Sequence, residues 1–123
     1  MRVLIVDDSK AMRSIIGRIV KELGFEVLEA GDGRLALAQL EGAGSVDLCL
    51  VDWNMPVMNG IEFVEAVRGK HAWDPVKLMM ITTASDVEHV RRALEAGANE
   101  YLMKPFTKEM IAEKLAMFGM GSN

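Results

Sequence analysis

The sequence predicts a single α/β domain built on a mostly parallel, doubly wound sheet of five strands with helices on both faces. Short apolar runs that end in turn residues alternate with longer segments in which apolar residues recur every three or four positions. This alternation occurs five times and is typical of parallel sheets whose helices cross between neighbouring strands. The length of 123 residues fits one domain of this class.

Each expected strand is a short run of apolar residues, and each expected helix begins near a capping residue or a glycine. The predicted strands are Val3–Val6, Phe25–Ala30, Val46–Val51, Lys77–Ile81 and Glu100–Met103. The predicted helices run from Ser9 to Leu23, from Asp32 to Leu40, from Gly60 to Val67, from Ser85 or Asp86 to Gly97, and from Thr107 to Phe118. Asn59-Gly60 is interpreted as a turn, 69–74 as a loop, and 119–123 as a flexible tail after a domain of residues 1–118.

Composition narrows the function classes. Half of the residues are hydrophobic and the net charge is -4, which disfavours non-specific binding to nucleic acid. No apolar stretch reaches the length of a membrane span, and Met1 leads directly into a strand rather than into a secretory signal. The single cysteine, Cys49, is expected to be a buried core thiol. We therefore expect a cytoplasmic protein.

Polar groups stand at the ends of four predicted strands. Asp7 and Asp8 follow the first strand, Asp52 the third, Thr82 the fourth and Lys104 the fifth. In a flavodoxin-like sheet with strand order 2-1-3-4-5, the carboxyl ends of these strands meet at one edge, where such folds bind their ligands. We expect three carboxylates, a hydroxyl and an ammonium to share one cleft.

The charge of this cleft favours a divalent cation. Two carboxylates about 4 Å apart repel by roughly 4 kcal/mol at an effective dielectric of 20, and Lys104 alone does not neutralise three of them. Oxygen ligands favour Mg²⁺, with Mn²⁺ as a substitute. Zinc is disfavoured because Cys49, His71 and His89 lack ligand spacing. Both histidines, and Lys114, are expected to be solvated surface residues.

A metal, a carboxylate, a hydroxyl and a lysine together indicate phosphoryl chemistry. Asp52 is the best candidate for a nucleophile that forms an aspartyl phosphate, with Asp7 and Asp8 holding the metal. Structural alternatives remain open. Asp7-Asp8 could cap a helix, Thr82 could be an ordinary strand residue, and Tyr101 could be a fixed, half-buried aromatic residue.

The motifs resemble, in order and spacing, those of response-regulator receiver domains, most closely the single-domain chemotaxis type. The resemblance covers Arg2 to about Phe118 and rests on VLIVDDS, LVDWNMPVMNG, MMITTAS and YLMKPFT. It implies that Asp52 accepts a phosphoryl group from a histidine kinase or phosphotransfer protein, and that the chain is not a classical enzyme. It also implies that Asp8, Asp52 and the carbonyl of Asn54 ligate Mg²⁺, with Asp7 acting directly or through water.

Further roles follow from the same resemblance. Lys104 would pair with the carboxylate and then with the phosphoryl oxygens, and the bond before Pro105 would be cis. Thr82 would bond the phosphoryl group, and Tyr101 would then turn inward. This step would reshape the face of the fourth helix, fifth strand and fifth helix, where a target protein binds. The chain would act as a monomer without contacting nucleic acid or membrane, and its role would be in chemotaxis.

The sequence departs from the usual family pattern beside Thr82. The next position, usually alanine or glycine, is Thr83, whose branched side chain could narrow access to the phosphoryl group. Ala84 occupies a position where some relatives carry an acid or amide that touches the attacking water. The resemblance therefore gives no lifetime for the phosphorylated state.

Two other functions compete. A haloacid-dehalogenase-like, Mg²⁺-dependent phosphatase also uses Asp, Thr and Lys, but it usually has an acid two residues after the nucleophile, where this chain has Asn54. Its nucleophile also normally lies in the first strand motif. A flavodoxin-like binder of flavin or nucleotide would need a phosphate-binding loop after the first strand, and DDSKAMR is acidic instead.

Overall fold

The computed structural model describes residues 1–53, 55, 58–83 and 87–120. Five parallel strands form one sheet in the order β2-β1-β3-β4-β5, which confirms the predicted doubly wound, flavodoxin-like architecture. The strands are β1 Arg2–Val6, β2 Glu26–Ala30, β3 Leu48–Asp52, β4 Lys77–Thr83 and β5 Glu100–Lys104. The helices are α1 Lys10–Glu22, α2 Gly33–Gly42, α3 Gly60–Arg68, the 3₁₀ helix η1 His71–Trp73, α4 Val87–Ala96 and α5 Lys108–Met117.

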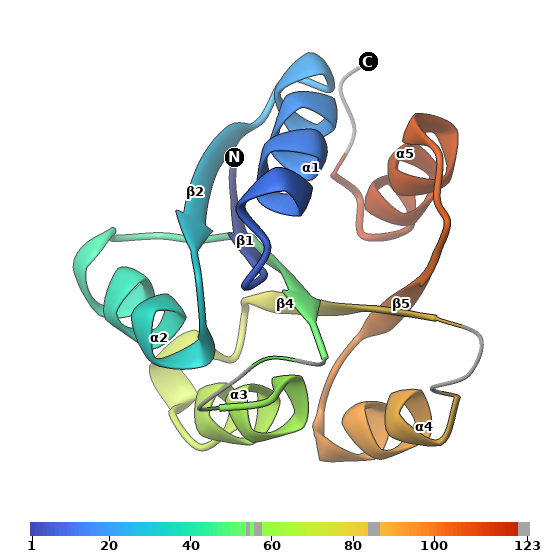
Figure 1. The fold of residues 1–123 in the computed structure, drawn as a ribbon. Helices are drawn as coiled ribbons and strands as arrows, with labels where there is room; N and C mark the ends of the chain where they lie inside the picture. Colours follow the sequence, from blue (N-terminus) through green and yellow to red (C-terminus); the bar gives the residue numbers. More distant parts are fainter. Residues whose placement is uncertain (54, 56–57, 84–86, 121–123) are drawn as a thin grey trace.

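Helices cover both faces of the sheet, with α1 and α5 on one face and α2, α3 and α4 on the other (Figure 1). Successive side chains of a strand point to opposite faces, so β1 contributes to two cores. Val3 and Ile5 pack with the residues of α1 and α5, whereas Leu4 and Val6 pack with those of α2 and α3. All five residues of β3 are buried, as expected for a central strand covered on both sides.

Side-chain caps fix where the helices begin. Ser9, Asp32 and Thr107 each accept a hydrogen bond from a backbone N–H in the first turn of the following helix, as predicted. Asn59 was interpreted only as a turn residue, but it forms a reciprocal capping box with Glu62 at the start of α3. This start sets the direction in which the chain leaves the end of β3.

Several strand boundaries in the structure differ from the predicted ones by one or two residues. β3 begins at Leu48 rather than at Val46, and it includes Asp52, whose backbone pairs with Ile81 of β4. β4 continues through Thr82 and Thr83 because both pair with β5. The predicted loop at 69–74 contains the 3₁₀ helix.

The C-terminal segment is partly packed rather than wholly flexible. Met120 is buried in the core between α1 and α5, and its N–H donates to the carbonyl of Leu115. Residues 121–123 lie outside the described residues, so a tail remains a prediction there. Within the described ranges, every helix is too short or too polar to cross a membrane.

Arg68, at the end of α3, ties together the segments around β4. Its guanidinium donates to the carbonyls of Trp73, Asp74, Val76 and Gly97 and to Oδ1 of Asn99. Gly97 has a φ of +122°, and a Cβ there would lie 2.6 Å from Cγ of Arg68, so glycine permits this close approach.

Replacing Arg68 with lysine should lower the free energy of unfolding by about 1–2 kcal/mol, because lysine keeps the charge but cannot reach several acceptors at once. Urea denaturation measures the change. Arg92→Lys, on the exposed surface of α4, is the matched control and should be neutral. Equal stability of both variants would contradict the structural role of Arg68.

Candidate functional site

Three carboxylates meet at the carboxyl edge of the sheet. Asp7 and Asp8 directly follow β1, and Asp52 ends β3, the neighbouring strand, in which Val51 pairs with Val6. One oxygen from each carboxylate lies within 4.8 Å of the others. Asp7 is 2% exposed and Asp52 is 8% exposed, whereas Asp8 is open to solvent. The predicted convergence of these three residues is confirmed.

Asp7 has the environment in this cluster that most favours a nearby cation. Its Oδ1 accepts a hydrogen bond of 2.8 Å from the N–H of Ser9, while its buried Oδ2 has no hydrogen-bond partner among the described residues. Burial is the largest effect and raises the pKa of Asp7 above its ordinary value. The hydrogen bond from Ser9 and the charge of Lys104 oppose this rise, the charge of Asp8 adds less to it, and the charge of Arg13 opposes it least. A buried carboxylate with an unused oxygen suits a hard divalent cation.

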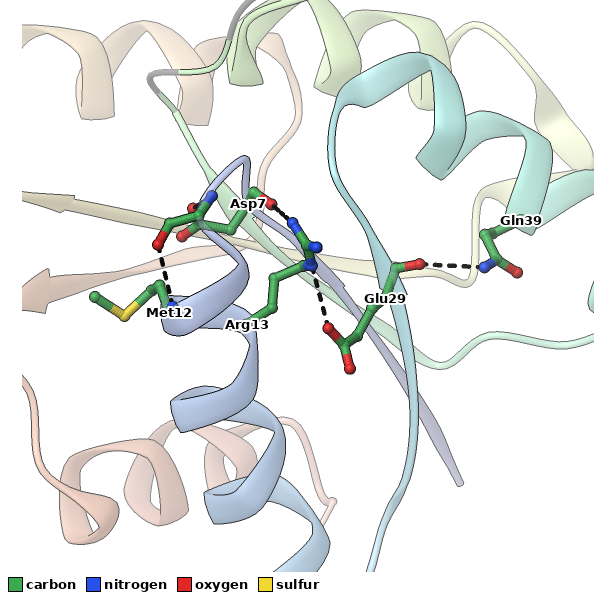
Figure 2. Close-up of polar contacts among 6 residues, drawn as sticks. Asp7, Met12, Arg13, Glu29 and Gln39 are labelled. Atoms are coloured by element: carbon green, nitrogen blue, oxygen red, sulfur yellow. Dashed lines mark hydrogen bonds and ion pairs between the residues drawn. The ribbon is translucent and has the colours of Figure 1, made fainter.

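Arg13 supports this edge from α1, as Figure 2 shows. Its Nη1 donates to the main-chain carbonyl of Asp7, and its Nε lies 3.1 Å from Oε1 of Glu29 on β2. Gln39 of α2 donates to the carbonyl of Glu29 (Figure 2). Sequence reasoning missed Arg13, although its place one turn after Ser9 put it on the helix end nearest the carboxylates.

The other predicted groups lie at the ends of β4 and β5. Lys104 is half-buried at the end of β5, paired in register with Thr83, and its charge lowers the pKa of Asp7. Thr82 is 2% exposed, and its hydroxyl donates to the carbonyl of Thr83 over 3.3 Å. The Lys104–Pro105 bond is cis, as the resemblance implied. Asn54 and Ala84 lie outside the described residues.

Trp53, next to Asp52, stacks on a histidine that was predicted to be solvated. The rings of Trp53 and His89 lie 3.6 Å apart between centroids with an interplanar angle of 17°. This corrects the prediction for His89, because α4 carries its half-buried ring to the end of β3. His71 is exposed as predicted and pairs with Asp74 at 3.3 Å.

Tyr101 lies on β5, where it pairs in register with Met80 of β4. The residue is 37% exposed, so it lies at the surface rather than in the core. A largely apolar cavity of about 260 Å³ lies between α4 and β5, lined by Val90, Arg91, Leu94, Tyr101 and Met103. The ring therefore borders both solvent and a space within the fold.

Comparisons with known proteins agree with this geometry. The family model of the response regulator receiver domain matches residues 3–116. The chain is similar to chemotaxis protein CheY1 of Helicobacter pylori (strain J99), with 41% identity over all of this chain and 99% of that protein. It is 42% identical to a CheY homolog of Campylobacter jejuni, covering 99% of this chain and 95% of the relative. The solved structure of chemotaxis response regulator CheY4 of Vibrio cholerae superposes with a TM-score of 0.87 at 37% identity, covering 94% and 96% of the two chains.

Proposed function

The chain belongs to the response regulator receiver domain family, and we propose that it serves chemotaxis signalling with Asp52 as its phosphoacceptor. It is a phosphorylation-dependent switch of a two-component system, as this family is. The observation that carries the residue assignment is the cluster of Asp7, Asp8 and Asp52 at one sheet edge. The phosphatase alternative receives no support from the proteins that match.

In the proposed reaction, a carboxylate oxygen of Asp52 attacks the phosphorus of a kinase phosphohistidine. The new O–P bond forms as the P–N bond breaks, and the imidazole nitrogen keeps the bonding pair and takes a proton from solvent. Asp52 suits this role because it ends a fully buried central strand, which fixes its backbone opposite Ile81. Fixed geometry is most of what such a loose transition state needs.

We infer that Asp8, Asp52 and the carbonyl of Asn54 hold Mg²⁺, with Asp7 acting directly or through water. Two features of Asp7 support this donor set: its buried Oδ2 has no hydrogen-bond partner among the described residues, and its pKa is raised. The ion would neutralise the oxygens of the transferring group, and Mn²⁺ has the same preference for oxygen ligands. Without it, the carboxylates of Asp7 and Asp8 repel the incoming phosphoryl group.

Lys104 and Thr82 are proposed to bind the phosphoryl oxygens once Asp52 is phosphorylated. Lys104 supplies an ammonium and Thr82 a hydroxyl, whose present bond to the carbonyl of Thr83 is long at 3.3 Å and thus easily exchanged. Movement of Thr82 lets the ring of Tyr101 turn inward, which changes the face of α4, β5 and α5 that binds the target protein. A pull-down with and without beryllofluoride, a phosphoryl mimic, identifies that state-dependent partner.

Labelling stoichiometry tests the function. Incubation with Mg²⁺ and either acetyl phosphate or a phosphorylated histidine kinase should add one phosphoryl group per chain, measured by intact-protein mass spectrometry. Multiple turnover of phosphate esters without accumulation of a labelled chain would favour a phosphatase and contradict the switch. Omission of Mg²⁺ should suppress labelling.

Thr83→Ala should speed labelling by acetyl phosphate by up to about tenfold, equivalent to about 1.4 kcal/mol of barrier. Thr83 is exposed at the end of β4 and pairs in register with Lys104, which is consistent with a branched side chain that narrows the approach to the site. Thr83→Val keeps the branched shape and is the matched control. The rate is followed by intact mass against time, and identical rates for Thr83→Ala and the wild type would rule out this steric role.

A further inference from the structure

A charged pair from α5 and β5 contacts the proposed switch residue. Nζ of Lys114 lies 5.1 Å from the centroid of the Tyr101 ring and 3.2 Å from Oε1 of Glu100. The same oxygen of Glu100 accepts a hydrogen bond of 2.9 Å from the N–H of Tyr101. The side chains of Lys114 and Glu100 are only 26% and 17% exposed, so Lys114 is not the solvated charge predicted from the sequence.

We propose that Lys114 is a positioning residue that holds the Tyr101 ring in its outward position, and that Glu100 fixes the ammonium of Lys114 for this purpose. This inference rests on the proposed role of Tyr101 as the switch. An ammonium within about 6 Å of an aromatic centroid is attracted to the face of the ring. Partial burial of the ion pair limits solvent screening, so the contact persists.

The contact favours one of two states. Lys114 belongs to α5, whereas the cavity that borders the ring lies between α4 and β5. A ring that turns inward moves away from Lys114 and loses the attraction. An interaction present in one state only shifts the population toward that state. The pair of Lys114 and Glu100 therefore opposes activation.

The position of the Tyr101 ring is also linked to the affinity of the site for a phosphoryl mimic. A ligand that binds the inward state better must first overcome whatever stabilises the outward state, so removal of Lys114 must tighten binding of a phosphoryl mimic. Loss of one cation–π contact, taken at the weaker end of the range for such contacts, corresponds to a change in affinity of about two- to fivefold. A purely structural role for Lys114 predicts no such gain.

The chain contains one tyrosine, so fluorotyrosine labelling reports on Tyr101 without resonance assignment. In Lys114→Met, the ¹⁹F resonance of the free protein should move toward the position that the wild type takes with Mg²⁺ and beryllofluoride. Beryllofluoride affinity should rise by about two- to fivefold. Glu100→Gln keeps an acceptor for the N–H of Tyr101 and should change both readouts in the same direction but less.

Two further variants control for charge and for helix stability. Lys108→Met removes another lysine of α5. Its Nζ lies 3.0 Å from Oε2 of Glu22, so it pairs with that residue rather than with the Tyr101 ring, and its loss should leave both readouts unchanged. Lys114→Arg keeps the cation and should restore wild-type behaviour. If Lys114→Met does not fold, Lys114→Arg and Glu100→Gln still decide the question, because the inference requires them to differ.

The outcomes separate this inference from the proposed function. If beryllofluoride leaves the wild-type resonance in place, the switch role of Tyr101 is wrong. If the wild type responds but Lys114→Met matches it in resonance and affinity, or binds the mimic more weakly, the positioning role of Lys114 is overturned and the switch stands.

Discussion

Asp52→Asn is expected to abolish phosphoryl labelling by both acetyl phosphate and a phosphorylated kinase. The amide is a poor nucleophile, because its remaining oxygen is neutral and lacks the negative charge with which the carboxylate attacks phosphorus. The loss should reach about a thousandfold or more in rate, as for removal of a covalent nucleophile. Intact mass gives the extent of labelling, and reductive trapping of the acyl phosphate followed by peptide mapping gives its position.

Asp47→Asn is the matched control for that experiment. Asp47 directly precedes β3, at the end of the strand opposite Asp52, and its carboxylate accepts the N–H of Arg2, a bond that asparagine can also accept. Labelling should stay at the wild-type level. Undiminished labelling of Asp52→Asn, with the label on Asp7 or Asp8, would show that the cluster is correct and the acceptor is misassigned.

The centre of the sheet was predictable because β1, β3 and β4 are buried on both faces over most of their length. Continuous apolar runs such as Leu48–Val51 have no other place in a domain of this size. The strand ends were less predictable, because backbone pairing does not stop where apolar character stops. Thr82 and Thr83 stay in β4 because β5 offers them partners, and Asp52 stays in β3 because Ile81 does.

The carboxylate cluster was also predictable, since parallel topology alone brings the ends of β1 and β3 together. The contacts that helix side chains make with the strands were not predictable from the sequence. His89 reaches Trp53, and Lys114 reaches Tyr101, because α4 and α5 pack on the sheet at particular rotations. Helical periodicity indicates which side of a helix is buried, but it does not say which strand residue a long side chain will meet.

The stability of the fold should respond to metal and to charge at the same cluster. Without metal, Asp8→Asn should raise the free energy of unfolding by about 1–2 kcal/mol, because it removes repulsion between Asp8 and the buried carboxylates of Asp7 and Asp52. With Mg²⁺ at about a hundred times its dissociation constant, the wild type should gain about 2.7 kcal/mol, and Asp8→Asn much less, because the ion binds the folded site. Thermal unfolding with EDTA and with Mg²⁺ measures both effects.

Because the pKa of Asp7 is raised, the free energy of unfolding should depend on pH, and the direction of the shift gives the sign. A carboxyl whose folded pKa lies above its unfolded value destabilises the fold at high pH, and the penalty disappears as pH falls through the folded pKa. In EDTA, Asp7→Asn should therefore raise the free energy of unfolding above that of the wild type most strongly near neutral pH. The difference between variant and wild type should shrink as the pH falls toward 3.8, the ordinary pKa of an aspartate. Mg²⁺ should shrink the advantage at neutral pH as well, because the ion neutralises the same charge. If Asp7→Asn is more stable than the wild type by the same amount at every pH, with and without Mg²⁺, then packing rather than buried charge determines the stability of this edge of the sheet.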